Sequence, residues 1–193
     1  MTTDKNDWLD LLQKRHVLQE GHFLLTSGRH SGQYLQCARL FQHPEDAERV
    51  GRALAVPFWD MGVDAVVGPA VGGIIAAHEA ARALGCRAVF TERENGQMTL
   101  RRGFQLEQGE RVVVVEDVVT TGGSVKEVLR VVESNGADVL GIASVVNRTG
   151  EGTPFQYPYH ALLSLHIETY EPDTCPLCRA GARPPIKPGS RRQ

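Results

Sequence analysis

Residues 112–124 read Val-Val-Val-Val-Glu-Asp-Val-Val-Thr-Thr-Gly-Gly-Ser, and this stretch decides the fold. Four consecutive valines predict a strand that is buried on both faces, as in a parallel sheet. The strand carries Glu116 and Asp117 to its carboxyl end, and residues 120–124 follow where the next helix is expected to begin. Such a turn can bind a phosphate, because backbone N–H groups and the helix dipole favour an anion and glycine lets the main chain come close.

The two carboxylates indicate what else the ligand carries. Beside a phosphate they would repel the ligand unless they bound something other than the phosphate. A pair of sugar hydroxyls or a Mg²⁺ ion is the natural partner. The segment therefore predicts a ribose 5-phosphate group. The plainer alternative is an ordinary strand–helix turn capped by Thr121 or Ser124, but the acidic pair directly before the turn favours the first interpretation.

The rest of the chain repeats the alternation of strand and helix. Apolar runs predict strands at residues 64–68, 86–91, 111–115, 139–146 and 160–165. Helical patterns cover residues 4–16, a segment opened by Pro44, 74–84 and 124–133. Residues 20–41 are expected to be irregular or strand-like, and residues 92–110 are polar. This order predicts an α/β fold with a doubly wound, mainly parallel sheet, which binds ligands beyond the carboxyl ends of its strands.

Composition excludes several classes of protein. The chain has 193 residues, of which 41% are hydrophobic and 23% are charged, so we expect a globular protein. The net charge of −2 lacks the basic excess of a nucleic-acid-binding domain. No apolar run reaches the roughly 18 residues that a membrane span needs. The acidic first twelve residues do not resemble a secretory signal. We therefore expect a soluble, cytoplasmic protein that binds neither nucleic acid nor a membrane.

Four cysteines do not predict a disulfide framework in such a chain. Cys37 and Cys86 stand in apolar surroundings and are expected in the core. The Cys-Pro-Leu-Cys segment at 175–178 has the spacing of half a zinc site, and His160, His166 or a second subunit could complete it. A single Cys-x-x-Cys segment is a weak signal for zinc, so reduced surface cysteines are the favoured interpretation. The sequence assigns no metal ligands.

The stretch 112–124 resembles the signature of type I phosphoribosyltransferases, which bind phosphoribosyl diphosphate (PRPP). The signature is a hydrophobic strand, two acidic residues, two apolar residues and Thr-Thr-Gly-Gly-Ser. The resemblance implies that the acidic pair holds the ribose 2- and 3-hydroxyls, that the following turn holds the 5-phosphate, and that Mg²⁺ is bound with PRPP. The residues it assigns to PRPP are Glu116, Asp117, Val118, Val119, Thr120, Thr121, Gly122, Gly123 and Ser124.

Further segments resemble the orotate phosphoribosyltransferases within that family. Residues 25–34 match a Ser-Gly-x-x-Ser-x-x-Tyr segment that helps cover the base, and they include Ser27; Thr26 stands where some relatives have lysine. Residues 68–74 resemble the diphosphate loop, with Gly72 where some relatives have lysine. Taken alone, each is also compatible with a common glycine-rich turn.

Arg148 follows the predicted strand 139–146 at the same edge of the sheet. In the orotate enzymes an arginine here contacts the carboxylated base, and the planar guanidinium suits two carboxylate oxygens. The alternative is a solvated loop arginine.

One loop departs from the family. Many orotate enzymes carry an Arg-Lys pair, a second lysine and a histidine in a mobile loop that covers the diphosphate. The corresponding residues 91–103 have no lysine and no histidine. Arg93 lines up with a basic member of the pattern, whereas Arg101 and Arg102 are displaced. We assign catalysis to Arg93, which would stabilise the diphosphate with help from Arg101 or Arg102, and to Asp117. The alternative is a hairpin whose arginines pair with the glutamates that flank Arg93.

The resemblance covers about residues 15–150 and is greatest to a short-loop variety typified by thermophilic bacteria. It implies a single phosphoribosyltransferase domain, with a hood at 1–45, a core sheet at 46–170 and a tail at 171–193. It also implies a homodimer with PRPP and orotate as substrates. The expected reaction gives orotidine 5-phosphate and diphosphate.

Two other functions share part of this pattern. A purine-base phosphoribosyltransferase would share the 112–124 motif but not the 25–34 segment. A PRPP-sensing regulator would need a basic face or a nucleic-acid-binding module, which the sequence lacks.

Overall fold

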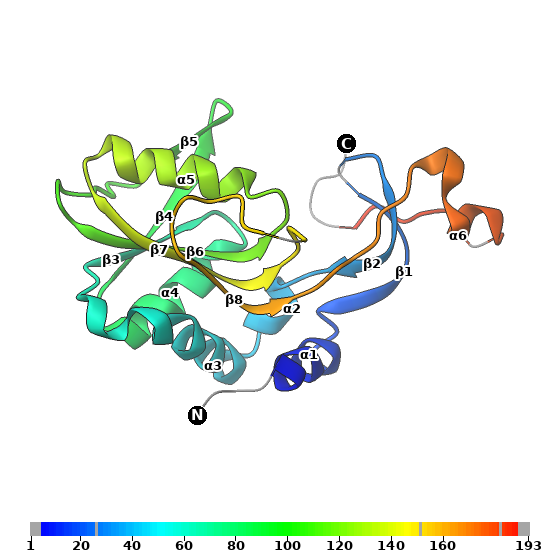
Figure 1. Ribbon diagram of the computed structural model, residues 1–193, viewed down its shortest axis with the longest axis horizontal. Coiled ribbons are helices and arrows are strands. Elements are labelled where there is room, and N and C mark those ends of the chain that lie inside the picture. Colours follow the sequence, from blue (N-terminus) through cyan, green and yellow to red (C-terminus); the bar gives the residue numbers. More distant parts are fainter. Residues whose placement is uncertain (1–4, 26, 151, 182, 189–193) are drawn as a thin grey trace. The chain divides into compact units, whose positions relative to one another are not determined.

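The computed structural model describes residues 5–25, 27–150, 152–181 and 183–188, which fall into two compact units (Figure 1). The sheet unit is the continuous stretch Phe41–Leu165. The hairpin unit combines the start of the chain up to Leu40 with the segment that begins at His166. No helix within the described ranges is both long and apolar enough to cross a membrane.

The sheet unit contains a six-stranded sheet in the order β5-β4-β3-β6-β7-β8. All neighbouring strands are parallel except β5, which runs antiparallel to β4. The predicted doubly wound, mainly parallel sheet is confirmed. Its strands are β3 (Ala65–Pro69), β4 (Arg87–Glu94), β5 (Gln97–Leu100), β6 (Arg111–Val119), β7 (Asp138–Asn147) and β8 (Tyr159–Ser164).

Helices cover both faces of this sheet, with α5 on one side and α3 and α4 on the other (Figure 1). Pro44 opens α3 as expected, because proline suits the first helical turn. Gly85 ends α4 in the left-handed conformation, with φ +72°. The helical elements are α2 (Ala38–Phe41), α3 (Pro44–Ala55), the 3₁₀ helix η1 (Val56–Met61), α4 (Gly73–Leu84) and α5 (Gly123–Ser134).

The valine strand lies at the centre of the core. Residues 112–115 of β6 are at most 1% exposed, which confirms that both faces are covered. Val114 pairs with Val67 of β3 on one side and with Ile142 of β7 on the other. A strand covered in this way is a rigid base for the polar residues at its end.

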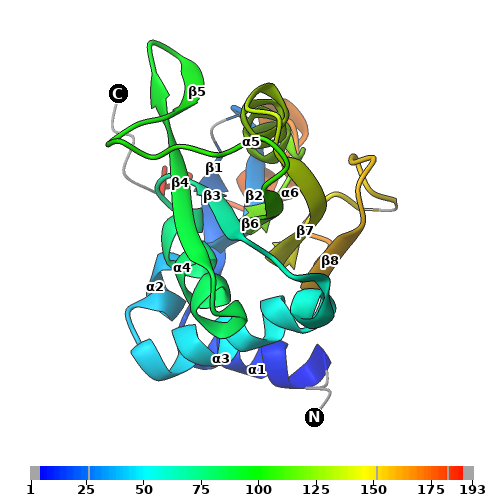
Figure 2. The same cartoon turned by 90° about the vertical axis from the view of Figure 1, so that its left-hand side faces the viewer.

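Two features of the sheet differ from the sequence prediction. Strand β6 continues to Val119, so the acidic pair, Glu116 and Asp117, lies within the strand and not after it. Pairing with β7 continues through Val119, whereas pairing with β3 ends at Val114, so β6 projects beyond β3. The stretch 92–110, described as polar with a hairpin as the alternative for its arginines, contains the turn and second strand of the antiparallel β4–β5 hairpin, which extends beyond α5 in Figure 2.

The hairpin unit is built on two antiparallel strands. Its elements are α1 (Lys5–Lys14), β1 (Leu18–Leu24), β2 (His30–Leu35), the 3₁₀ helix η2 (Pro172–Thr174) and α6 (Pro176–Arg179). Helix α1 was expected at 4–16, and the two strands fall in the stretch expected to be irregular or strand-like. Cys37 is buried as predicted, whereas Cys86, in the sheet unit, is only half-buried.

The C-terminal segment, residues 166–181 and 183–188, joins the β1–β2 hairpin through backbone hydrogen bonds. His30 and Tyr170 exchange N–H···O bonds of 2.8 Å. The Ile186 N–H donates to the His22 carbonyl at 2.8 Å, and the Leu24 N–H donates to the Ile186 carbonyl at 2.9 Å. The tail expected at 171–193 is therefore hydrogen-bonded to the hairpin at Ile186, and residues 189–193 lie outside the described part.

Candidate functional site

A cavity of ≈210 Å³ lies at the carboxyl end of β6. It collects most of the residues that the sequence assigned to PRPP, together with Arg93. Its lining consists of Arg93, Glu116, Val118, Val119, Thr120, Thr121, Gly122, Gly123, Ser124, Val125 and Glu127. The position agrees with the general rule that parallel sheets bind ligands beyond the carboxyl ends of their strands.

The phosphate loop, residues 120–124, leads directly from β6 into α5. Gly122 is the N-cap of α5 and has φ +76°, a conformation that side chains rarely adopt. A Cβ there would also lie 2.8 Å from the Phe155 ring, so both backbone and space require glycine. The first N–H groups of a helix have no partners inside the helix, and together with its dipole they make this loop suitable for a phosphate.

The acidic pair lies beside this loop, with Glu116 buried and Asp117 half-buried. Glu116 is 7% exposed and lines the cavity. The Asp117 N–H donates to Glu116 Oε1 at 3.1 Å, and the Val118 N–H donates to Asp117 Oδ1 at 2.7 Å. Burial raises the pKa of Glu116 well above its usual range, and the neighbouring Asp117 carboxylate raises it further. Burial likewise raises the pKa of Asp117. Two carboxylates in this state favour a cation or hydroxyl donors as ligands.

The diphosphate loop, residues 68–74, lies against the acidic pair. A Cβ at Gly72 would be 2.5 Å from Asp117 Oδ2, and one at Gly73 would be 3.2 Å from Glu116 Oε1. A side chain at Gly72 would require the Asp117 carboxylate to move, so the structure places Gly72 directly against a residue that the sequence assigned to ribose. The peptide bond between Ala70 and Val71 in this loop is cis.

The three arginines proposed for the diphosphate are placed differently. Arg93 lines the cavity and its guanidinium pairs with Glu127 at 2.7 Å. Arg102 makes a two-point ion pair with Glu92, at 2.7 and 2.9 Å, and Arg101 lies 3.3 Å from Glu94. The hairpin with paired arginines that was the alternative is thus present for Arg101 and Arg102.

Arg148 and Ser27 belong to different units. Arg148 follows β7, and its N–H donates to the carbonyl of Val119 at 2.8 Å, so its backbone lies beside the start of the phosphate loop. Ser27 is in the hairpin unit, where its hydroxyl accepts a 3.5 Å hydrogen bond from the Arg29 N–H. Thr26 lies outside the described residues.

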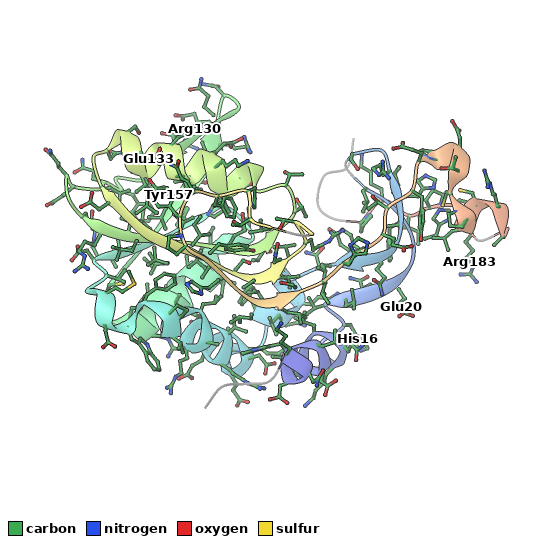
Figure 3. The ribbon with its side chains drawn as sticks, viewed as in Figure 1. His16, Glu20, Arg130, Glu133, Tyr157 and Arg183 are labelled. Carbon is green, nitrogen blue, oxygen red and sulfur yellow. The ribbon has the colours of Figure 1, made fainter. Side chains whose placement is uncertain are left out.

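Glu127 and Val125 line the cavity, although the sequence analysis did not predict them as site residues. Both lie in the first turns of α5, and Glu127 is four residues after Gly123, so it faces the same side of the helix. Helical spacing from the phosphate loop could have identified it. Away from the cavity, Glu133 at the other end of α5 accepts a 2.8 Å hydrogen bond from the Tyr157 hydroxyl (Figure 3).

The cysteine pair also differs from the prediction. Cys175 is 0% exposed, so it is not a surface cysteine, although Cys178 is exposed. The pair lies with His22 and His30 of the β1–β2 hairpin in a thiol–imidazole cluster. The two histidines that were expected to be the nearest candidates are elsewhere: His160 packs edge-on against Phe58 in the sheet unit, and His166 is exposed and outside the cluster.

Comparison with known proteins identifies the family of this chain. Residues 38–169 match the phosphoribosyl transferase domain, and the chain belongs to the phosphoribosyltransferase family. It is 51% identical over 189 residues to the orotate phosphoribosyltransferase of Thermoanaerobacter sp. strain X514, covering 98% of this chain and 99% of the relative. The orotate phosphoribosyltransferase of Thermotoga maritima is 50% identical over 182 residues, covering 94% and 97%. Within the family, the chain is a member of the orotate phosphoribosyltransferases.

Solved structures give the same fold. The orotate phosphoribosyltransferase of Aeropyrum pernix has a TM-score of 0.65 and 30% identity, over 81% of this chain and 92% of that one. The enzyme of Mycobacterium tuberculosis H37Rv has a TM-score of 0.67 and 26% identity, over 82% and 97%. The predicted enzyme class and fold are therefore confirmed.

Proposed function

We propose that this chain transfers the ribose 5-phosphate group of PRPP to orotate, giving orotidine 5-phosphate and diphosphate in pyrimidine biosynthesis. One structural observation carries the proposal: Glu116, next to Asp117 in the acidic pair, lines the same cavity as a glycine-containing helix N-terminus. A ligand with a diol and a terminal phosphate satisfies both groups at once. The orotate specificity rests on the relatives that are about half identical over nearly the whole chain.

The ribose phosphate is held by two neighbouring groups in this proposal. Backbone N–H groups of the phosphate loop donate to the 5-phosphate, and the hydroxyls of Thr120, Thr121 and Ser124 add further donors. Glu116 and Asp117 accept hydrogen bonds from the 2- and 3-hydroxyls in their ionised form. Because the carboxylates are held by a rigid strand, the ribose carbon that reacts is held in a fixed position, which is the main catalytic benefit of binding.

Bond breaking leaves negative charge on the diphosphate. The base nitrogen attacks C1 of the ribose as diphosphate departs, through a transition state with oxocarbenium character. Arg93 is the basic residue of the cavity lining and is proposed to stabilise the leaving group, with the diphosphate loop around Gly72 supplying N–H groups. The buried carboxylates fit a divalent cation bound with PRPP, and Mg²⁺ would neutralise diphosphate charge.

The base is recognised by the remaining predicted residues. Arg148, which emerges beside the phosphate loop, is proposed to bind the orotate carboxylate with its planar guanidinium. Ser27 and its segment are proposed to cover the base. The proposal further includes a homodimer, as the family resemblance implies, and a cytoplasmic location, as the composition and N-terminal sequence predict.

An absorbance assay tests this function. Purified protein is mixed with orotate, PRPP and Mg²⁺, and the loss of the orotate ultraviolet band is followed with single omissions as controls. We expect loss only when all three are present. Parallel reactions with adenine, hypoxanthine and xanthine are expected to release no diphosphate. Turnover of a purine in place of orotate would overturn the substrate assignment and leave the PRPP site intact.

A further inference from the structure

The thiol–imidazole cluster of the hairpin unit has no role in the chemistry above. It consists of His22, His30, Cys175 and Cys178, and the four ligand atoms lie within 4.8 Å of one another. Three of the four residues are buried. His22 and His30 come from adjacent strands β1 and β2, and the cysteines come from the C-terminal segment. From this arrangement we propose that the cluster is a structural zinc site that fastens the C-terminal segment to the hairpin.

Four of the six distances between ligand atoms are close to the edges of one tetrahedral site, and all six are within 4.8 Å. Zinc bonds of about 2.0–2.1 Å to nitrogen and about 2.3 Å to sulfur imply edges of roughly 3.4 Å between two nitrogens and roughly 3.6 Å between nitrogen and sulfur. His22 Nε2 lies 3.6 Å from Cys175 Sγ and 3.7 Å from Cys178 Sγ, and His30 Nδ1 lies 3.4 Å from Cys178 Sγ. The two imidazole nitrogens are 3.0 Å apart, slightly closer than the ideal edge.

A hydrogen bond to the main chain favours the tautomer of neutral His22 that a metal needs. Its Nδ1 lies 2.8 Å from the carbonyl oxygen of Arg183, which can only accept a hydrogen bond, so Nδ1 carries the proton. In the neutral ring, Nε2 is therefore unprotonated and presents its lone pair to the cluster. A backbone carbonyl that orients a ligating imidazole in this way is a regular feature of metal sites. Arg183 itself lies in the C-terminal segment (Figure 3).

The cysteines are positioned by a short helical turn. Pro176 opens α6, and the Arg179 N–H donates to the Cys175 carbonyl at 3.2 Å. Residues three apart on such a turn point to the same side, so both sulfurs face the histidines. Two thiolates and two neutral imidazoles favour zinc over magnesium or calcium, and four protein ligands leave no open position for a substrate. The ion would thus act on stability and not in catalysis.

The ion would join parts of the chain that are far apart in sequence. His22 and Cys178 are separated by 156 positions, so one metal ion closes a very long loop. Closing a loop of this length removes many conformations of the unfolded chain, and metal binding energy becomes folding energy. The backbone hydrogen bonds at Tyr170 and Ile186 hold the same segment, so the ion would reinforce an existing junction.

Metal analysis of the full chain, purified without chelator and saturated with Zn²⁺ before dialysis, tests the proposal. We expect one zinc per chain in the wild type and a large loss of bound zinc in Cys178→Ser and His30→Ala. Cys86→Ser and His166→Asn are matched controls, because they remove a cysteine and a histidine outside the cluster, and both are expected to keep the metal. A strong chelator is expected to lower the unfolding temperature of the wild type and of both controls, but not that of Cys178→Ser.

Cobalt substitution makes the test independent of whether the variants fold. Co²⁺ bound by two thiolates and two imidazoles gives intense tetrahedral d–d bands and thiolate-to-metal charge-transfer absorption. We expect both in the wild-type chain and in the two controls. The proposal is overturned if the cobalt-loaded wild type lacks thiolate charge transfer, if the wild type holds no zinc after saturation, or if Cys178→Ser retains it.

Discussion

The β6 cavity and the thiol–imidazole cluster both bring ionisable groups together, yet they are assembled differently. In the cavity, the acidic pair and the phosphate loop are consecutive in sequence and are carried by one strand and the helix that follows. In the cluster, two histidines from a hairpin meet two cysteines about 150 positions later in the chain. The cavity leaves space for a ligand, whereas the four groups of the cluster face one another. The first arrangement suits a substrate that enters and leaves, and the second suits an ion that stays.

The largest loss of activity is expected from a substitution of Arg93 in the β6 cavity. If this residue stabilises the departing diphosphate, Arg93→Ala is expected to lower kcat by about 10²–10³-fold, the usual cost of losing one charge-stabilising donor. Arg102→Ala is the matched control, since Arg102 belongs to the same hairpin but pairs with Glu92. It is expected to leave kcat nearly unchanged. Steady-state rates with orotate and PRPP measure both. Equal rates for wild type and Arg93→Ala would show that Arg93 has no catalytic role and serves only as the ion-pair partner of Glu127.

A smaller loss is expected from the acidic pair. Asp117→Asn removes an ionised acceptor, and a hydrogen bond to a charged group contributes about 1.5–3 kcal/mol, a factor of roughly 10–150. We therefore expect kcat/KM for PRPP to fall within that range. Asp138→Asn is the control, because Asp138 is exposed at the start of β7. Should the two variants bind PRPP equally well in calorimetry, the diol would have to be held elsewhere.

The acidic pair also predicts a pH dependence of modest size. Burial raises the pKa of Glu116, so a proton stays on the pair at pH values where an exposed carboxylate is ionised. Because the ribose hydroxyls need an ionised acceptor, kcat/KM for PRPP is expected to fall, by at most about tenfold per pH unit, as the pH drops below the raised pKa of the pair. Glu116→Gln is expected to move this acidic limb to lower pH.

The stability of the free protein is expected to change with pH in the opposite direction to kcat/KM: it decreases as the pH rises. The folded pKa of Glu116 lies above the unfolded value, so the free protein holds more protons when folded in that window and loses stability as pH rises through it. Unfolding temperatures of the ligand-free wild type are therefore expected to decrease across this window more steeply than those of Glu116→Gln. Identical slopes for the two proteins would mean that the carboxyl is not buried in the folded state.

The sequence predicted the β6 cavity well because its information is local. The valine run identifies a central strand, and the acidic pair and glycines identify what that strand presents. The length of β6 was missed, because Val118 and Val119 continue to pair with β7 after pairing with β3 has ended. The contact of Gly72 with Asp117 was not predictable either, since it depends on how two loops turn at neighbouring strands.

The thiol–imidazole cluster could not be completed from the sequence. The cysteine spacing is local and was recognised, but the histidines were sought nearby in sequence, at positions 160 and 166. His22 and His30 carry no local signal, because each is a single residue in a short strand. Only antiparallel pairing of β1 and β2, followed by return of the C-terminal segment, brings the four residues together. Long-range pairing of this kind leaves no periodic pattern in the sequence.

The smallest expected effect separates the metal site from the polar contacts around it. Arg29 ties the hairpin to the C-terminal segment: its guanidinium donates to Thr169 Oγ1 at 2.9 Å and to the Thr169 carbonyl at 2.8 Å, and it pairs with Glu171. The side chain is 39% exposed, so Arg29→Ala is expected to cost only about 1 kcal/mol, a shift of about 2–4 °C in unfolding temperature.

Zinc content decides what this small shift means. Arg29→Ala is expected to retain the full metal complement, whereas Cys178→Ser loses it and unfolds at a lower temperature than Arg29→Ala. Arg52→Ala serves as control, because Arg52 makes an exposed helical ion pair with Glu48 in the sheet unit. Loss of zinc from Arg29→Ala would mean that the contacts of Arg29 are needed to hold the C-terminal segment in place before the four ligands can bind the metal. Retention of zinc with a small thermal shift would mean that the four ligands, and not Arg29, contribute most of the stability of the contact between the C-terminal segment and the hairpin.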